Sequence, residues 1–147
     1  MAFAPLEGKR FVEITDRHTA VDYARFLQQV SDVWFPDANK IALVQDNLNT
    51  HRPASLYEAF PANEARRLVE RFEWHFTPKH GSWLNMAECE LSVLSSQCLD
   101  RRIPAKEIMI EEVAAWEAER NKKNTKTDWQ FTTADARVKL KRLYPSL

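Results

Sequence analysis

Two acidic residues, Asp46 and Glu88, stand in sequence settings that catalytic carboxylates often occupy. Asp46 follows an apolar run, residues 41–44, that is typical of a strand covered on both faces. An acid at the carboxyl end of such a strand lies where α/β folds place their sites, because the sheet edge opens there into a crevice. The alternative is that Asp46 only caps the next turn. The chemistry that two such carboxylates suggest normally needs a third acid.

Glu88 falls in a segment, residues 85–98, that is helical by its spacing. The predicted apolar stripe of this helix is Ala87, Leu91, Leu94 and Cys98. Glu90 would lie about 200° further around the helix, so Glu88 and Glu90 cannot face the same site. Ser92 and Ser95 share the side of Glu88, where their small side chains would let a backbone or a nucleic-acid strand approach closely. The alternative is that Glu88 is an ordinary solvent-exposed side chain.

The first part of the chain predicts the elements that precede Asp46. Short runs on either side of Gly8 indicate a hairpin formed by residues 2–6 and 10–15. Thr19 and Asp22 match the capping box of a helix start, and apolar residues then continue at helical spacing. The strand that ends near Asp46 therefore follows a hairpin and a helix.

The rest of the chain adds one more strand and several helices. A helix from about Pro53 is interrupted by Pro61, and residues 74–76 are predicted to form a strand. Further helices are predicted at residues 85–98, 104–120 and 133–143, with a polar loop at 121–128. The order of hairpin, helix, strand, helix, strand and helices predicts an α/β fold with mixed strand directions.

The composition fits one globular domain. The chain has 147 residues, of which 44% are hydrophobic and 29% charged, enough for one core. No stretch approaches the apolar run of about 20 residues that a membrane span requires, and the start lacks the features of a secretory signal. We therefore expect a cytoplasmic protein without a membrane partner. Cys89 and Cys98 would lie about 13 Å apart along one helix, so we expect free thiols.

The charge is unevenly distributed, although the net charge is zero. From Arg120 to Leu147 eight Lys or Arg residues oppose two Asp residues, a surplus of six positive charges. A basic patch beside an acidic body can bind nucleic acid. For any single residue of the tail, a solvated surface charge is the alternative interpretation.

Two motifs together resemble a known family. The first is Gln45-Asp46-Asn47-Leu48-Asn49-Thr50-His51. The second is Thr77-Pro78-Lys79-His80-Gly81-Ser82-Trp83-Leu84-Asn85-Met86-Ala87-Glu88. They look like a DDE transposase, and more narrowly like the bacterial insertion-sequence branch of the mariner-like superfamily. That branch carries its second aspartate in an Asp-Asn-x-x-x-His setting and its last acid after Leu-Asn, and the tail from Asp128 to Pro145 resembles it as well.

The resemblance implies an RNase H-like fold, which is a mixed sheet flanked by helices, here followed by a helical C-terminal extension. It also implies a phosphoryl-transfer site in which Asp46 and Glu88 are catalytic and hold a divalent metal. Hard oxygen ligands suit Mg²⁺ or Mn²⁺, and two such ions can activate the attacking oxygen and stabilise the leaving one. The implied partner is DNA, at transposon ends and targets, and the implied setting is bacterial and chromosome-associated.

The same family carries an earlier aspartate, on the first strand of its sheet, that no residue of this sequence matches. Glu13 and Asp16, near the end of the predicted hairpin, do not match that position either. We therefore expect a partial catalytic domain over residues 1–147 that lacks its first strand. Residues from about 1 to 100 would form the core, and residues from about 104 to 147 a basic helical tail.

Basic and aromatic residues are the candidates for DNA contact. His51 belongs to the aspartate motif, and the loop before Glu88 offers groups that could bind a phosphate or stack on a base. The candidates in that loop are Lys79, His80 and Trp83, for which a loop anchored by one buried Trp is the alternative. The candidates in the tail, which could neutralise phosphates, are Lys122, Lys123, Lys126, Arg137, Lys139, Lys141 and Arg142.

We therefore predict a transposase fragment that is a poor or inactive nuclease alone, because losing one ligand leaves the metal pair under-coordinated. The alternative is a non-catalytic protein that binds DNA through its tail or self-associates as a homodimer through unpaired strand edges. A relic without a selected function is a third interpretation. The irregular spacing of His51, His75 and His80 matches no zinc signature, so it does not favour a zinc site with Asp46.

Overall fold

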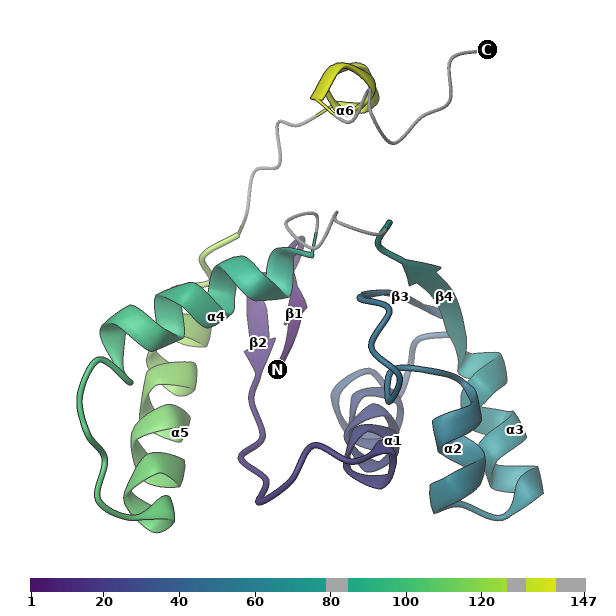
Figure 1. Cartoon of the computed structure of the whole chain (residues 1–147), viewed down its shortest axis with the longest axis horizontal. Helices are drawn as coiled ribbons and strands as arrows, with labels where there is room; N and C mark the ends of the chain where they lie inside the picture. The colour runs from purple at the N-terminus through teal and green to yellow at the C-terminus, as the bar shows by residue number, and fades with distance from the viewer. Residues whose placement is uncertain (79–84, 127–131, 140–147) are drawn as a thin grey trace.

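A computed structural model describes residues 1–78, 85–126 and 132–139 (Figure 1). The elements in these ranges are β1 (Ala2–Ala4), β2 (Lys9–Phe11), α1 (Ala20–Gln29), the π-helix η1 (Val30–Trp34), β3 (Ile41–Gln45), α2 (Ala54–Ala59), α3 (Ala62–Arg71), β4 (Phe72–Phe76), α4 (Met86–Gln97), α5 (Lys106–Lys122) and α6 (Thr133–Lys139). The predicted α/β class and the predicted order of elements are confirmed.

The described strands form two separate two-stranded sheets, whereas the sequence predicted one mixed sheet. β1 pairs antiparallel with β2, with Phe3 opposite Arg10. β3 pairs parallel with β4, with Leu43 opposite Trp74. In the view of Figure 1 the strands follow one another in the order β2, β1, β3 and β4. Among the described residues no strand pairing joins β1 to β3, so each of these strands has one unpaired edge.

Helix α1 begins with the predicted capping box. The backbone N–H of Asp22 donates to Thr19 Oγ1 at 3.2 Å, and the Thr19 N–H donates to Asp22 Oδ2 at 2.9 Å. These two bonds satisfy backbone donors that the first helical turn leaves without partners. The chain continues from α1 directly into η1, the π-helical segment.

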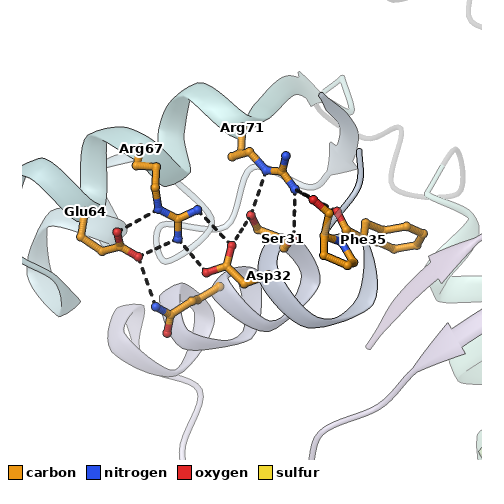
Figure 2. Close-up of polar contacts among 8 residues, drawn as sticks. Ser31, Asp32, Phe35, Glu64, Arg67 and Arg71 are labelled. Carbon is orange, nitrogen blue, oxygen red and sulfur yellow. Dashed lines mark hydrogen bonds and ion pairs between the residues drawn. The ribbon is translucent and has the colours of Figure 1, made fainter. Parts of the chain in front are cut away.

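Two arginines of α3 bind the π-helical segment η1, which continues α1 (Figure 2). Arg71 Nη2 donates to the Phe35 carbonyl oxygen at 2.8 Å, next to the point where η1 ends. Arg67 Nη2 lies 2.6 Å from Asp32 Oδ2 and 2.7 Å from Glu64 Oε1, and its hydrogen bond lowers the pKa of Asp32. These contacts fix the position of η1 relative to α3.

An apolar core joins α1, α2 and α3 to one face of the β3–β4 sheet. Its buried members are Ala24, Leu27, Val30, Leu56, Ala65, Leu68 and Phe72. Ile41 and Leu43 of β3 pack against this core, whereas Val44 is 54% exposed. The prediction that this strand is covered on both faces was therefore wrong, because successive side chains alternate and the buried cluster lies on one face only.

The hairpin, α4 and α5 form the other part of the molecule, in which α4 contacts β1 and α5 contacts β2. Its centre is ionic. Arg10, which is 0% exposed, donates from Nε to Glu90 Oε2 at 2.8 Å, and Arg120 Nε donates to the same oxygen at 2.9 Å. The apolar stripe predicted for α4 is partly wrong, because Glu90 is buried and Leu91 is 45% exposed.

Helix α5 runs two residues into the segment that was predicted to be a polar loop from residue 121. The reason lies in Asn121, whose side chain accepts a hydrogen bond from Arg10 N at 2.7 Å and donates one to Arg10 O at 2.8 Å. This amide extends the hydrogen bonding of β2 to the end of α5. Cys89 and Cys98, at either end of α4, are free thiols as predicted.

Two contacts tie distant segments together. The Phe11 ring of β2 stacks on Trp34 of η1, with the ring centroids 4.2 Å apart and the planes at 11°. Gly8, in the hairpin turn, has a φ of 65°, and a Cβ there would lie 2.8 Å from the backbone carbon of Asn124. The turn can approach the end of α5 this closely only because residue 8 has no side chain.

Candidate functional site

Asp46 follows the last residue of β3, at the carboxyl end of the parallel pair, as predicted. Its Oδ1 accepts a hydrogen bond from the Leu48 N–H at 3.2 Å and lies 2.5 Å from His51 Nδ1. The carboxylate therefore caps the turn that follows β3. This cap leaves Oδ2 available, because both contacts go to Oδ1 and no described residue bonds the other oxygen. The Asp46 side chain is 37% exposed, so solvent and ligands can reach it.

The His51 imidazole is held from several sides. Its Nδ1 faces Asp46, and its ring lies 4.6 Å from the Tyr23 ring. Gln45 Nε2 donates to the His51 carbonyl oxygen at 2.8 Å, and the Tyr23 hydroxyl donates to Gln45 Oε1. Burial raises the pKa of Tyr23 above its ordinary value, which keeps this hydroxyl protonated as a donor. The Asp46–His51 pair is thus fixed by neighbours that are themselves anchored.

The rest of this loop is also fastened to the ends of β3 and β4. Asn47 Nδ2 donates to the Thr77 carbonyl oxygen at 2.6 Å, and the Thr77 N–H donates to the Gln45 carbonyl oxygen at 2.8 Å. At the far end of the loop, Ser55 Oγ donates to the Thr50 carbonyl oxygen at 2.8 Å. These bonds predetermine the loop geometry, so a ligand would meet a preformed surface.

An open hollow of roughly 430 Å³ lies beside Asp46. It is lined by Asn47, Leu48, residues 51–54 and Phe76. Phe76 is the last residue of β4 and is 42% exposed, and Leu48 is 47% exposed. The hollow therefore combines apolar surface with an imidazole, an amide and a guanidinium at the carboxyl ends of two parallel strands.

Glu88 lies in the first turn of α4, whose N-cap is Asn85. Asn85 Oδ1 accepts from the Ala87 N–H at 3.2 Å, and the partly buried Glu88 side chain bonds no described residue. A carboxylate is favourable at this helix start, because the helix dipole is positive there. Ser92, predicted to leave room for a nucleic-acid strand, is exposed and donates its hydroxyl to the Glu88 carbonyl oxygen at 3.0 Å.

Asp46 and Glu88 come from different parts of the chain, the end of β3 and the first turn of α4. In Figure 1 the N-terminal end of α4 lies on the side toward which β4 points, and β3 runs parallel to β4. Among the described residues, no hydrogen bond links the two acids and no three His, Cys, Asp or Glu side chains form a group that could hold a metal. Glu90 faces away from Glu88 as predicted, toward Arg10 and Arg120.

Glu13 and Asp16 line a different hollow from the one beside Asp46. Lys106 Nζ lies 2.7 Å from Asp16 Oδ1. These acids are therefore not positioned to complete a site at Asp46. His75, on the exposed face of β4, pairs with Glu73 at 2.9 Å and not with His51.

The candidates for DNA contact fall into three groups. Lys79, His80, Trp83, Lys141 and Arg142 lie outside the described residues, as does the side chain of Lys139. Lys122, Lys126 and Arg137 are exposed. Lys123 is also exposed and pairs with Glu119 at 2.6 Å. His51 is the remaining candidate, and it lines the hollow beside Asp46.

Three residues that position this loop were not assigned a role from the sequence: Tyr23, Gln45 and Asn47. Gln45 carries a usable signal, because the period of two places it on the same face as Ile41 and Leu43. A polar residue on the core face, directly before a candidate acid, indicates a buried hydrogen-bond network. Tyr23 has no such signal, since its spacing in α1 is that of an ordinary core residue.

Comparisons with known proteins bear on this site. A family model described as DDE superfamily endonuclease matches residues 1–110, which contain both Asp46 and Glu88. Neither the curated proteins nor the solved structures contain a match. No helix within the described ranges is long and apolar enough to cross a membrane. Because the match covers most of the sequence, the chain belongs to the DDE superfamily endonuclease family.

Proposed function

We propose that this chain is the C-terminal part of a transposase catalytic domain from the bacterial insertion-sequence branch of the mariner-like superfamily. The complete domain cleaves and joins DNA strands at transposon ends. One observation carries the proposal: in an endonuclease-family chain, Asp46 directly follows a parallel strand, and the described residues bond only one of its carboxylate oxygens. In this proposal residues 1–100 form the core and residues 104–147 a tail that contacts DNA phosphates.

Asp46 and Glu88 are the proposed ligands of Mg²⁺ or Mn²⁺. Their donor chemistry fits, because Mg²⁺ is usually held by one or two carboxylates together with waters and substrate phosphate. When bound, the ions stabilise the attacking and leaving oxygens of the phosphoryl transfer. His51 donates from Nδ1 to Asp46 Oδ1 and so fixes the carboxylate, which leaves Oδ2 as the atom offered to metal. Second-sphere hydrogen bonds of this kind orient ligands.

The chain alone is proposed to be a poor or inactive nuclease, because one acid is missing. The two separate sheets support this proposal. A further strand between the unpaired edges of β1 and β3 would join them into one mixed sheet. If that strand runs parallel to β3, its carboxyl end lies beside Asp46, where a third acid is needed.

Mn²⁺ binding to the purified chain with a short DNA duplex tests the proposed ligands. Asp46→Asn or Glu88→Gln should weaken binding about ten-fold or more, since each removes a ligand charge. Electron paramagnetic resonance of free Mn²⁺ gives the affinity. Asp37→Asn, at an exposed acid outside the site, is the matched control and should bind normally. Unchanged binding in both ligand variants would remove Asp46 and Glu88 from the metal site.

A plasmid-nicking assay tests the inactivity of the isolated chain. With Mg²⁺ or Mn²⁺ we expect no cleavage above that of the Asp46→Ala variant. Robust metal-dependent cleavage that Asp46→Ala abolishes would contradict the missing-acid proposal while supporting the assignment of Asp46.

The second candidate function is a non-catalytic protein that self-associates and binds DNA. It is favoured by the unpaired edges of β1 and β3 and by the exposed Val44. Sedimentation velocity should then show a dimer that Val44→Lys shifts toward monomer, whereas Val33→Lys, at another exposed valine in η1, leaves it intact. A monomer at every concentration would exclude strand-mediated association. DNA affinity that does not change with salt would exclude binding through the basic tail.

A further inference from the structure

The hollow beside Asp46 is lined by the loop after β3 and by Phe76 of β4. Hydrogen bonds of Gln45, Asn47 and Ser55, described above, hold this loop in place. The Phe76 ring and the Arg52 side chain are both solvent-accessible. A preformed surface with accessible binding groups loses little entropy when a ligand binds.

Phe76 occupies an unusual place for a phenylalanine. It shares the inward face of β4 with Phe72 and Trp74, which pack in or against the core. Phe76 lies beyond that core, at the strand end, and remains 42% exposed beside the hollow. An exposed aromatic ring at a strand end offers a flat face on which a planar group can stack.

The polar groups of the hollow match a nucleotide better than an apolar ligand. Arg52 supplies a positive charge. Among the described residues its side chain donates one hydrogen bond, from Nη2 to Asn49 Oδ1 at 3.2 Å, and the guanidinium has further N–H groups that can donate. Asn47 and His51 also line the hollow and add polar groups. A volume of roughly 430 Å³ lies within the range of small-ligand sites, about 300–1,000 Å³.

We propose that this hollow binds one unpaired nucleotide of a DNA strand, with its base stacked on Phe76 and its phosphate bound by Arg52. The inference rests on the proposed function, because it takes DNA as the ligand. The base must be unpaired, since in a duplex both faces of a base are covered by its neighbours and cannot stack on a side chain. The hollow thereby holds the strand next to Asp46 and selects single-stranded or frayed DNA.

Fluorescence anisotropy of a labelled oligonucleotide tests this site with the full chain. The probes are one short sequence, single-stranded and as a duplex, in EDTA so that no metal contributes. Phe76→Leu should weaken single-strand binding about five-fold or more and duplex binding less than two-fold, because removing one stacked base costs this much. Phe76→Trp should retain the affinity of the native chain. Tyr57→Leu, at another exposed aromatic residue, is the control and should bind normally.

Arg52→Gln tests the phosphate contact separately. It should weaken single-strand binding and reduce the slope of log affinity against log salt by about one, since one phosphate contact is lost. Thermal melting of each variant shows whether it is folded.

The outcomes separate the two proposals. If Phe76→Leu leaves single-strand binding unchanged, or weakens single-strand and duplex binding equally in a folded protein, the nucleotide site is refuted. If Phe76→Leu acts selectively but Asp46 and Glu88 bind no metal, the nucleotide site stands and the metal proposal fails. If metal binds through both acids but Arg52→Gln and Phe76→Leu have no effect, only the nucleotide site fails.

Discussion

The half of the molecule that carries Asp46 and the half that carries Glu88 are stabilised by different interactions. Around Asp46, α1, α2 and α3 bury a continuous apolar cluster beneath β3 and β4. Around Glu88, the described residues contribute Leu94 and Val113 as buried apolar side chains, and the centre is the Arg10–Glu90–Arg120 ion cluster. The position of Asp46 therefore depends on hydrophobic burial, and the position of Glu88 depends on paired buried charges.

The difference predicts how each half responds to damage. An apolar core relaxes partly around a lost methyl group, whereas a buried charge that loses its partner keeps its full desolvation cost. The position of Glu88 should consequently be the more fragile of the two, because its helix is fixed through Glu90, two residues further along.

The largest expected effect comes from Glu90→Ala. This change leaves Arg10 buried without its carboxylate and should lower the free energy of unfolding by about 3–5 kcal/mol. Urea denaturation measures the loss, and hydrogen exchange should place it in β1, β2, α4 and α5. Leu68→Ala is the counterpart, since Leu68 is fully buried in the other half, and it should lower protection in α1 to α3 instead. An equal loss of hydrogen-exchange protection in both halves would show that the two halves are not stabilised separately.

Acid should weaken the ionic half more than the apolar half. Burial raises the pKa of Glu90, but hydrogen bonds from Arg10 and Arg120 outweigh it and lower the pKa from 4.5 to about 2. A lowered carboxyl pKa adds stability that is present above pH 4.5 and is lost as the pH falls toward 2. The contribution is roughly 3 kcal/mol. Urea denaturation across this pH range measures it, and Glu90→Gln should flatten the dependence. An unchanged slope in Glu90→Gln would show that other carboxyls cause the acid response.

The smallest effect concerns the contact between the halves. Phe11→Leu removes the ring that stacks on Trp34 and should cost about 1 kcal/mol. Trp fluorescence and far-ultraviolet circular dichroism, followed through the same urea titration, would report whether the halves still unfold together. Separate transitions in the variant, with one transition in the native chain, would identify this stack as the coupling. A single transition in both would assign the coupling to other contacts.

Local sequence signals predicted much of the fold. The Thr19–Asp22 capping box gave the start of α1, and Pro53 and Pro61 bracketed α2, because these signals act within one helical turn. The place of Asp46 after β3 followed from a short apolar run in the same way. Local chemistry therefore located both candidate acids on their elements.

The errors came from interactions between distant residues. Nothing near Glu90 in the sequence indicates that it pairs with Arg10, 80 positions away. The exposure of Val44 depends on whether another element covers the second face of β3. The apolar run of residues 41–44 carries no information about that element. The hollow likewise joins the loop after β3 to Phe76 of β4, so it exists only once these strands pair.

The close approach of Gly8 to Asn124 has a consequence for sequence variation. Any residue with a side chain at position 8 must both adopt a φ of 65° and displace backbone atoms 2.8 Å away. Leu6, two positions earlier, is 83% exposed and meets no such constraint. A library in which every position is randomised and folded variants are recovered should therefore keep glycine alone at position 8 while accepting most residues at position 6.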